Sequence, residues 1–121
     1  YNDTNATTPD ATLAALHSFP AGKTILIMGG ADKGLDMAGL VSELPNRTKK
    51  VLLLDGTGTN RVASEIPNHT IYGSVSDAVQ DAQKIAESGD TVLLSPAFAS
   101  FGMFKNEYDR GDQFTAIVQQ L

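Results

Sequence analysis

Short apolar runs without polar alternation are the feature that most restricts how this chain can fold. The four residues Val51–Leu54 are all apolar, and a β-rich run at residues 23–28 becomes apolar after Thr24. A strand without alternating polar side chains is expected to be covered on both faces. Glycine follows each run, as Gly29-Gly30 and within residues 55–58. We therefore predict two buried strands, each of which ends in a sharp turn.

Segments with helical spacing alternate with these runs. Thr8, Pro9 and Asp10 supply a hydroxyl N-cap, a proline at the first helical position and an acid in the first turn. This pattern predicts the start of a helix. Leu13 and Leu16 would then mark its inner face.

A second helix is predicted after the first strand by apolar residues at i, i+3, i+4 and i+7. These residues are Met37, Leu40, Val41 and Leu44. Pro45 and Asn46 are expected to end this helix. A short third helix is expected through Val62, Ala63 and Ile66.

The second half continues the alternation, with a brief strand at residues 70–72. Ser74 and Asp77 resemble a capping box for the next helix, and Gly89 is its expected carboxyl-terminal stop. A fourth strand is predicted at residues 91–95. The last helix is expected to show one apolar face, formed by Phe114, Ile117, Val118 and Leu121.

Short strands that alternate with helices predict a parallel sheet, because right-handed crossovers place the helices on its two faces. The expected fold is a Rossmann-like three-layer α/β sandwich with a mostly parallel sheet. The 121 residues suit one domain. An apolar content of 41% with 19% charged residues is typical of a globular protein.

Composition also excludes several functions. No apolar run approaches the roughly 20 residues that cross a bilayer, and the first residues do not resemble a signal peptide, so we expect a cytoplasmic location. The chain has no cysteine, which excludes disulfides and thiolate catalysis. A net charge of −5 with scattered cations disfavours nucleic acid as a partner. His17 and His69 lack neighbours that would complete a metal site.

Ligands of open α/β sheets bind beyond the carboxyl ends of the strands. The loops at residues 29–36, 55–61 and 95–106 are therefore the candidate site. In the first loop Lys33 could meet an anion, although the loop matches neither common phosphate-binding glycine motif. Taken alone, Lys33 is more often a surface residue and Ser100 more often a helix cap.

Two other patterns in these loops favour structural roles. Gly56 and Gly58 begin like a dinucleotide fingerprint, but Arg61 occupies the third glycine position, so we interpret the stretch as a turn. The spacing around Ser95 and Ser100 does not fit a serine hydrolase. The charged residues near the start of the last helix are interpreted as helix-dipole and surface charges: Asp109, Arg110 and Asp112.

Five stretches of this chain resemble the Mur ligase family, in the branch that adds D-glutamate. They are Asn2–Thr7, Gly29–Lys33, Leu94–Ser100, Phe104–Asn106 and Arg110–Phe114. Their order and spacing match the third domain of that family over the whole chain, residues 1–121. The most specific part of the resemblance is a pair of motifs, Ser-Pro-Ala-x-Ala-Ser and Phe-Lys-Asn-x-x-x-Arg-Gly-Asp.

The resemblance implies an ATP-dependent ligase that adds D-glutamate to UDP-N-acetylmuramoyl-L-alanine in peptidoglycan biosynthesis. In such an enzyme the first domain holds the uridine nucleotide, and the central domain supplies the phosphate loop and the Mg²⁺ ligands. The third domain positions D-glutamate and closes over ATP. This chain would be that third domain, inactive and without bound cofactor when alone. Residues 1–7 would be a remnant of the interdomain hinge.

The resemblance also implies roles for individual residues. Lys33 would neutralise one carboxylate of D-glutamate, with help from the hydroxyl of Thr7. Ser100 would hydrogen bond the other carboxylate, together with the position of Glu107, where the family usually has an aromatic residue.

Two residues near the amino end would contact the nucleotide. Asp3 matches an acid that meets the ATP ribose hydroxyls, and Asn5 replaces a lysine that is common in the family. No metal ligand is implied in this chain. Two alternatives stay open: another Mur-type or folylpolyglutamate-type ligase domain, and a free-standing, non-catalytic α/β binding module.

Overall fold

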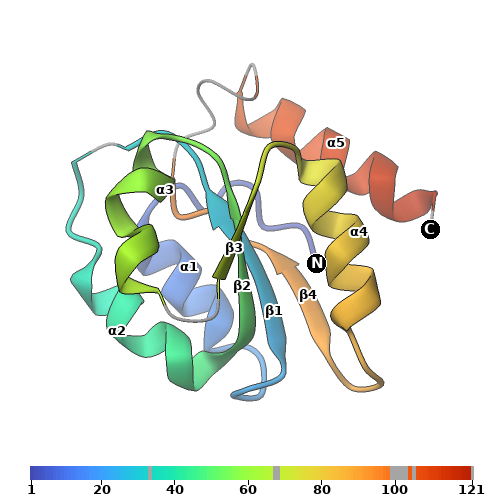
Figure 1. Cartoon of the computed structure of the whole chain (residues 1–121), viewed down its shortest axis with the longest axis horizontal. Coiled ribbons are helices and arrows are strands. Elements are labelled where there is room, and N and C mark those ends of the chain that lie inside the picture. The colour runs from blue at the N-terminus through green and yellow to red at the C-terminus, as the bar shows by residue number, and fades with distance from the viewer. Residues whose placement is uncertain (33, 67–68, 99–103, 105, 121) are drawn as a thin grey trace.

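The sheet has four parallel strands in the order β3-β2-β1-β4 (Figure 1). The strands are β1 (Thr24–Gly29), β2 (Thr48–Leu54), β3 (His69–Tyr72) and β4 (Thr91–Leu94). The computed structural model describes residues 1–121 except 33, 67–68, 99–103, 105 and 121. The predicted parallel sheet is confirmed.

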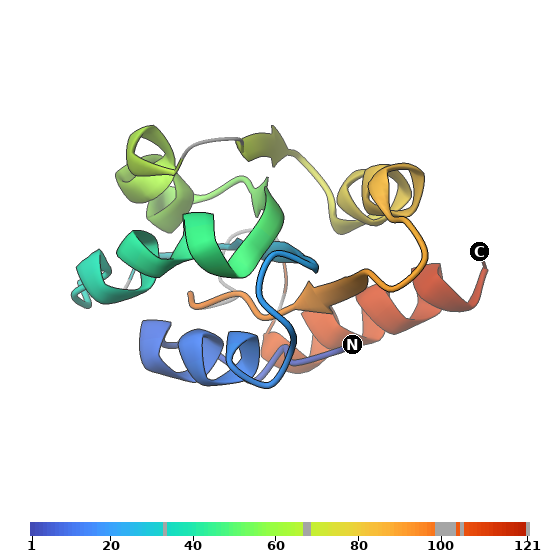
Figure 2. The ribbon, with the colours of Figure 1, turned by 90° about the horizontal axis from the view of Figure 1, so that it is seen from below.

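Helices cover both faces of the sheet. They are α1 (Pro9–Leu16), α2 (Ala38–Arg47), α3 (Thr57–Val62), α4 (Val75–Ile85) and α5 (Glu107–Gln119), with a 3₁₀ turn, η1 (Ala63–Glu65), after α3. Figure 2 shows α1, α2 and α3 on one side of the sheet, and α4 and α5 on the other. The structure therefore confirms the Rossmann-like three-layer sandwich.

Alternate strand residues feed two separate cores. Leu26 and Leu53 join the core beneath α1, α2 and α3, whereas Ile27 and Leu52 join the core beneath α4 and α5. All four of the residues Val51–Leu54 are at most 2% exposed. This burial on both faces explains why the run contains no polar residue.

The first residues of the chain extend the sheet beyond β4. Asn2 forms a parallel bridge with Leu94. The amide of Asp3 donates to the Leu94 carbonyl at 2.7 Å, and the Leu94 amide donates to the Tyr1 carbonyl at 2.9 Å. The segment that precedes α1 is thus attached to the same sheet edge as β4.

The second helix differs from its prediction at both ends. Met37, expected inside the helix, is its N-cap, and the helix continues through Pro45 to Arg47. The predicted end at Pro45 was therefore wrong. A proline in the last turn removes only one backbone hydrogen bond there, and the Thr48 hydroxyl donates to the Leu44 carbonyl at 2.6 Å.

Two predictions about later helices also need correction. Ser74 is confirmed as the N-cap of α4, because its Oγ accepts from the Asp77 amide at 3.2 Å. The helix nevertheless ends at Ile85, and Gly89, with φ +93°, lies in the following turn. Val118, predicted on the buried face of the last helix, is 42% exposed. The carboxyl-terminal turns of α5 extend past the sheet (Figures 1 and 2).

A tyrosine–aspartate pair links β3 to α4 and predicts a pH effect. Tyr72 donates to Asp81 at 2.6 Å, and burial, followed by this contact, raises the pKa of Tyr72 to about 12. A raised folded-state pKa means that the stabilisation is present below pH ~10 and is lost as the pH rises through 12.

We expect Asp81→Asn to lower the pKa of Tyr72, because the substitution removes a charge that opposes ionisation. The ring ¹³Cζ shift of Tyr72, followed from pH 8 to 13, measures it. Asp77→Asn on the same helix is the control. Equal pKa values in the two variants would contradict a role for Asp81.

Candidate functional site

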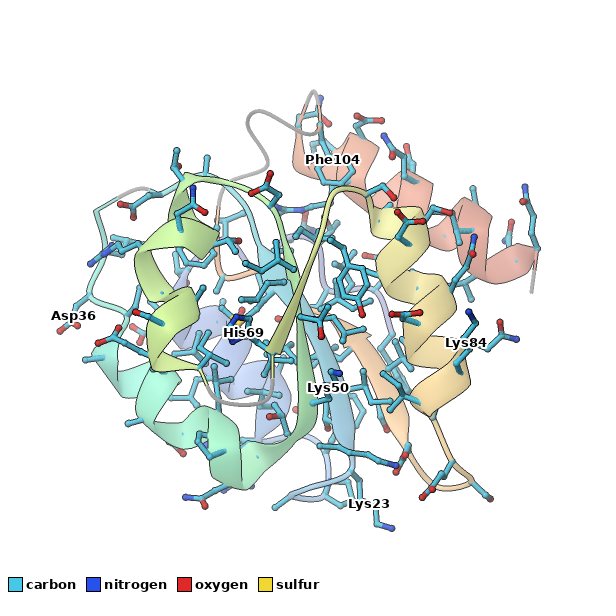
Figure 3. The ribbon with its side chains drawn as sticks, viewed as in Figure 1. Lys23, Asp36, Lys50, His69, Lys84 and Phe104 are labelled. Atoms are coloured by element: carbon cyan, nitrogen blue, oxygen red, sulfur yellow. The ribbon has the colours of Figure 1, made fainter. Side chains whose placement is uncertain are left out.

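The carboxyl ends of β1 and β4 form the topological switch point of the sheet. From β1 the chain moves outward to β2 and β3, and then returns to β4 on the other side of β1. The chain after β1 leads to α2 on one face of the sheet, and the chain after β4 leads to α5 on the other face. Ligands of open α/β sheets bind at such a point. Figure 3 shows Phe104 at this edge beside the start of α5, and Lys23 at the opposite end of the sheet.

Two glycines let three loops approach one another at this edge. Gly29 and Gly30 have φ values of +120° and +142°, which side chains rarely adopt. The Gly29 amide donates to the Pro96 carbonyl at 2.9 Å, and the Gly58 amide donates to the Gly30 carbonyl at 2.8 Å. The loop after β1 is thus joined to the loops after both β4 and β2.

The loop after β1 is anchored to α3 through Asp32, the residue before position 33. The amide of Asp32 donates to Thr57 Oγ1 at 2.8 Å, and Asp32 Oδ1 accepts from Arg61 Nη1 at 2.8 Å. The same carboxylate oxygen accepts from the Gly34 amide at 3.0 Å. Arg61, which breaks the dinucleotide fingerprint, therefore forms an ion pair that holds this loop.

The glycine pair after β2 starts a helix rather than a turn, so the interpretation of that stretch as a turn was wrong. Gly56 is the N-cap of α3, which begins at Thr57. Gly58 lies within the helix against the ring of Phe98, whose Cε1 would be 2.5 Å from an added Cβ. Tertiary packing against the loop after β4 requires glycine here.

Asp3 is held in place by a buried hydroxyl at the end of β4. Ser95 is fully buried, and its Oγ donates to Asp3 Oδ2 at 2.8 Å. Thr12, also fully buried, donates to the Ser95 carbonyl at 3.0 Å. This network links the segment before α1, α1 itself and β4.

We expect Ser95→Ala to destabilise the protein by about 1–3 kcal/mol, because it removes a donor from the half-buried Asp3 carboxylate. Urea unfolding measures the loss. Ser88→Ala, in the exposed turn before β4, should stay within about 0.5 kcal/mol of the unsubstituted protein. A similar small change for Ser95→Ala would show that the hydroxyl adds nothing.

Ala97 has a backbone conformation that is unusual for a residue with a side chain. Its φ is +65°, and it is the one non-glycine residue with positive φ in the described part of the chain. The Ala97 amide donates to the Ala6 carbonyl at 2.8 Å. Such strain costs on the order of 1–3 kcal/mol and tends to occur at functional sites.

The structure brings together some of the predicted site residues. Asp3, Asn5 and Thr7 lie on one short segment beside the end of β4; Asn5 is exposed and Thr7 half-buried. Lys33 and Ser100 lie outside the described residues. Glu107 is the first residue of α5, and its side chain also lies outside the described part.

Arg110 corrects the interpretation of the charges near the start of α5. Its side chain is fully buried rather than on the surface, and it donates to Thr4 and to the Phe98 carbonyl. The sequence analysis missed this role, because a charged residue in the first turns of a helix is usually solvated. The adjacent Gly111, where an added Cβ would lie 2.5 Å from Thr4 Cγ2, was the available sign of close packing.

The described residues contain no group of three or more His, Asp or Glu side chains that could hold a metal ion. None of the described helices is long and apolar enough to cross a membrane.

Comparison with known proteins agrees with this geometry. Residues 1–98 match the family model described as Mur ligase, glutamate ligase domain. A protein of Roseiflexus named UDP-N-acetylmuramoylalanine--D-glutamate ligase is 46% identical over 99% of this chain and 27% of its own length. Proteins of the same name from Solibacter usitatus and Pseudomonas fluorescens are 43% and 41% identical over the whole chain and 28% of their own lengths.

The chain thus spans a little over a quarter of the length of these curated relatives. The family match covers all four strands. It also includes both loops of the switch point, up to Phe98. The chain belongs to the Mur ligase family, in which it corresponds to the glutamate ligase domain.

Proposed function

We propose that this chain is the domain that positions D-glutamate in an ATP-dependent ligase, which adds this amino acid to UDP-N-acetylmuramoyl-L-alanine in peptidoglycan biosynthesis. The observation that carries the proposal is similarity along the whole chain to relatives that share one name, at 41–46% identity. The switch-point site supports it independently, because it lies where this fold binds ligands.

The proposed chemistry has two steps. ATP phosphorylates the alanyl carboxylate, and the amine of D-glutamate then attacks the acyl phosphate to form a tetrahedral intermediate that expels phosphate. Mg²⁺, held by the parts of the enzyme that this chain does not span, would neutralise phosphate charge. The contribution of this chain is to hold the amine in line, and such positioning can supply several kcal/mol of the barrier.

The proposed contacts with D-glutamate come from the loops at the switch point. Lys33 neutralises one carboxylate of D-glutamate with the Thr7 hydroxyl, and a compact ammonium suits this role. Asp32, the residue before Lys33, anchors this loop to Thr57, and its carboxylate accepts from the amide of Gly34, the residue after Lys33. Ser100 binds the other carboxylate together with the backbone at Glu107.

The segment before α1 would contact the nucleotide. We propose that Asp3 meets the ribose hydroxyls of ATP, that Asn5 also contacts the nucleotide, and that residues 1–7 are a remnant of the interdomain hinge. One oxygen of the Asp3 carboxylate already accepts from Ser95, which leaves the other oxygen to meet a hydroxyl. Because ATP and the nucleotide-linked substrate are cytoplasmic metabolites, we propose a cytoplasmic location.

A domain exchange tests the proposal. This chain would replace the matching carboxyl-terminal region of the Roseiflexus relative, and phosphate release would be measured with ATP, UDP-N-acetylmuramoyl-L-alanine and an amino acid. We expect turnover that depends on D-glutamate and is not supported by L-glutamate. The unexchanged relative is the positive control.

Two outcomes would contradict the proposal. Turnover with a different amino acid would identify another Mur-type or folylpolyglutamate-type ligase domain. A folded exchange protein that releases no phosphate with any amino acid would favour a non-catalytic binding module.

A further inference from the structure

Arg110 joins two segments that are far apart in the sequence. Its Nε donates to Thr4 Oγ1 at 3.1 Å and its Nη2 donates to the Thr4 carbonyl at 2.8 Å. On its other side, Nη1 donates to the Phe98 carbonyl at 3.1 Å. The planar guanidinium therefore spans from the segment before α1 to the loop after β4.

Further contacts fix the same segment against α5 and β4. Asn2 Nδ2 donates to the Gly111 carbonyl at 3.1 Å and to Thr115 Oγ1 at 3.0 Å. The amide of Ala97 donates to the Ala6 carbonyl at 2.8 Å. Residues 2–6 are thus held at several points. Among the residues that make these contacts, Arg110 of α5 alone bonds both to the segment and to the loop after β4.

We propose that Arg110 is a positioning residue that locks residues 2–6 to the end of β4, so that the groups for ATP and for D-glutamate move as one body. This inference rests on the proposed function, which assigns Asp3 to the nucleotide and Thr7 to D-glutamate. Asp3 is the neighbour of Thr4, which Arg110 contacts directly. Thr7 directly follows Ala6, whose carbonyl is bonded to the β4 loop at Ala97. Residues 2–6 of the hinge remnant then move with this domain.

The geometry requires arginine in particular. A buried guanidinium must place its N–H groups on acceptors, because an unsatisfied buried charge is strongly unfavourable. Three donors of one rigid fork reach Thr4 and Phe98 at once. A lysine ammonium is a compact point charge on a flexible stem and cannot reproduce that fork.

The first test is amide hydrogen exchange on this chain. In Arg110→Met we expect the amides of Ala6 and Ala97 to exchange at least ~tenfold faster, as for a local opening, while those of Leu26 and Leu52 change little. Arg110→Lys keeps the charge and should show the same local pattern to a smaller extent. Arg47→Met is the matched control, because Arg47 is the last residue of α2 and lies at the end of the sheet opposite to the switch point.

Faster exchange at Leu26 and Leu52 to the same extent as at Ala6 would overturn the proposal, because Arg110 would then support the whole core. Unchanged exchange at Ala6 and Ala97 would overturn it as well. Arg110→Lys keeps these outcomes readable if Arg110→Met does not fold.

The second test is a KM comparison in the domain-exchanged ligase. Arg110→Lys should raise KM for both ATP and D-glutamate by about tenfold, which is about 1.4 kcal/mol, and leave KM for UDP-N-acetylmuramoyl-L-alanine unchanged. A loss of folded protein alone lowers the apparent kcat without moving either KM, and that result would overturn the positioning role. If the domain-exchanged ligase without further substitution shows no D-glutamate-dependent turnover, the proposed function fails. The amide hydrogen-exchange experiment still decides whether Arg110 holds the segment.

Discussion

Gly29→Ala should destabilise this protein by about 4 kcal/mol, which is a large part of the roughly 5–15 kcal/mol by which a domain is stable. Two effects add. Gly29 has φ +120°, which is strained for alanine, at on the order of 1–3 kcal/mol. An added Cβ would also lie 2.9 Å from the Leu54 amide nitrogen and 2.5 Å from Thr59 Oγ1, in addition to a clash with the Leu54 carbonyl. Overpacking of this kind costs about 1–3 kcal/mol more.

Urea unfolding at neutral pH measures this loss. Gly22→Ala is the matched control, because Gly22 has φ +77° but nothing within 4 Å of an added Cβ. It should lose only about 1–2 kcal/mol. Equal losses in the two variants would show that backbone conformation alone matters, and that the close approach of β1 to β2 at Gly29 does not.

Lys33→Ala should raise KM for D-glutamate about 100-fold in the domain-exchanged ligase, which corresponds to about 2.7 kcal/mol. Removal of one partner of a charge pair at a binding site typically costs 2–5 kcal/mol. KM for ATP should stay nearly unchanged, because the proposal assigns the nucleotide to Asp3 and Asn5. Steady-state kinetics with each substrate varied in turn makes the measurement.

Lys23→Ala controls for the loss of a positive charge. Lys23 is exposed and lies at the end of the sheet opposite to the switch point (Figure 3). We expect no change in either KM for this variant. An unchanged KM for D-glutamate in Lys33→Ala would remove Lys33 from the site and would leave the fold assignment intact.

Local chemistry predicted the layers of this protein because each signal was complete within a few residues. Val51–Leu54 is apolar throughout, and every side chain of this run is buried. Thr8 and Ser74 cap helices through hydrogen bonds to amides three residues later. The same local patterns placed the candidate loops at one sheet edge, because parallel strands share the direction of their ends.

The resemblance to Mur ligases was also readable from short stretches of sequence. The match of residues 1–98 to the glutamate ligase domain confirms it. The roles of Thr7, Lys33, Ser100 and Glu107 remain predictions, since they depend on a substrate that the fold alone does not reveal.

Contacts between distant segments decided what local patterns could not. Gly58 was interpreted as part of a turn, yet the ring of Phe98, 40 positions later in the sequence, requires glycine inside a helix there. Arg61 finds Asp32 across two loops. Neither partner can be identified from the residues beside it.

Arg110 shows the difference most clearly. From the sequence alone it is a charged residue near the start of a helix, and such residues are usually exposed to solvent. The sequence determined the strands, the helices and the edge where a ligand would bind, because hydrophobic periodicity and capping act over a few residues. Only the tertiary structure buried Arg110 against Thr4 and Phe98, because a charge enters the interior only where folding has already assembled its acceptors.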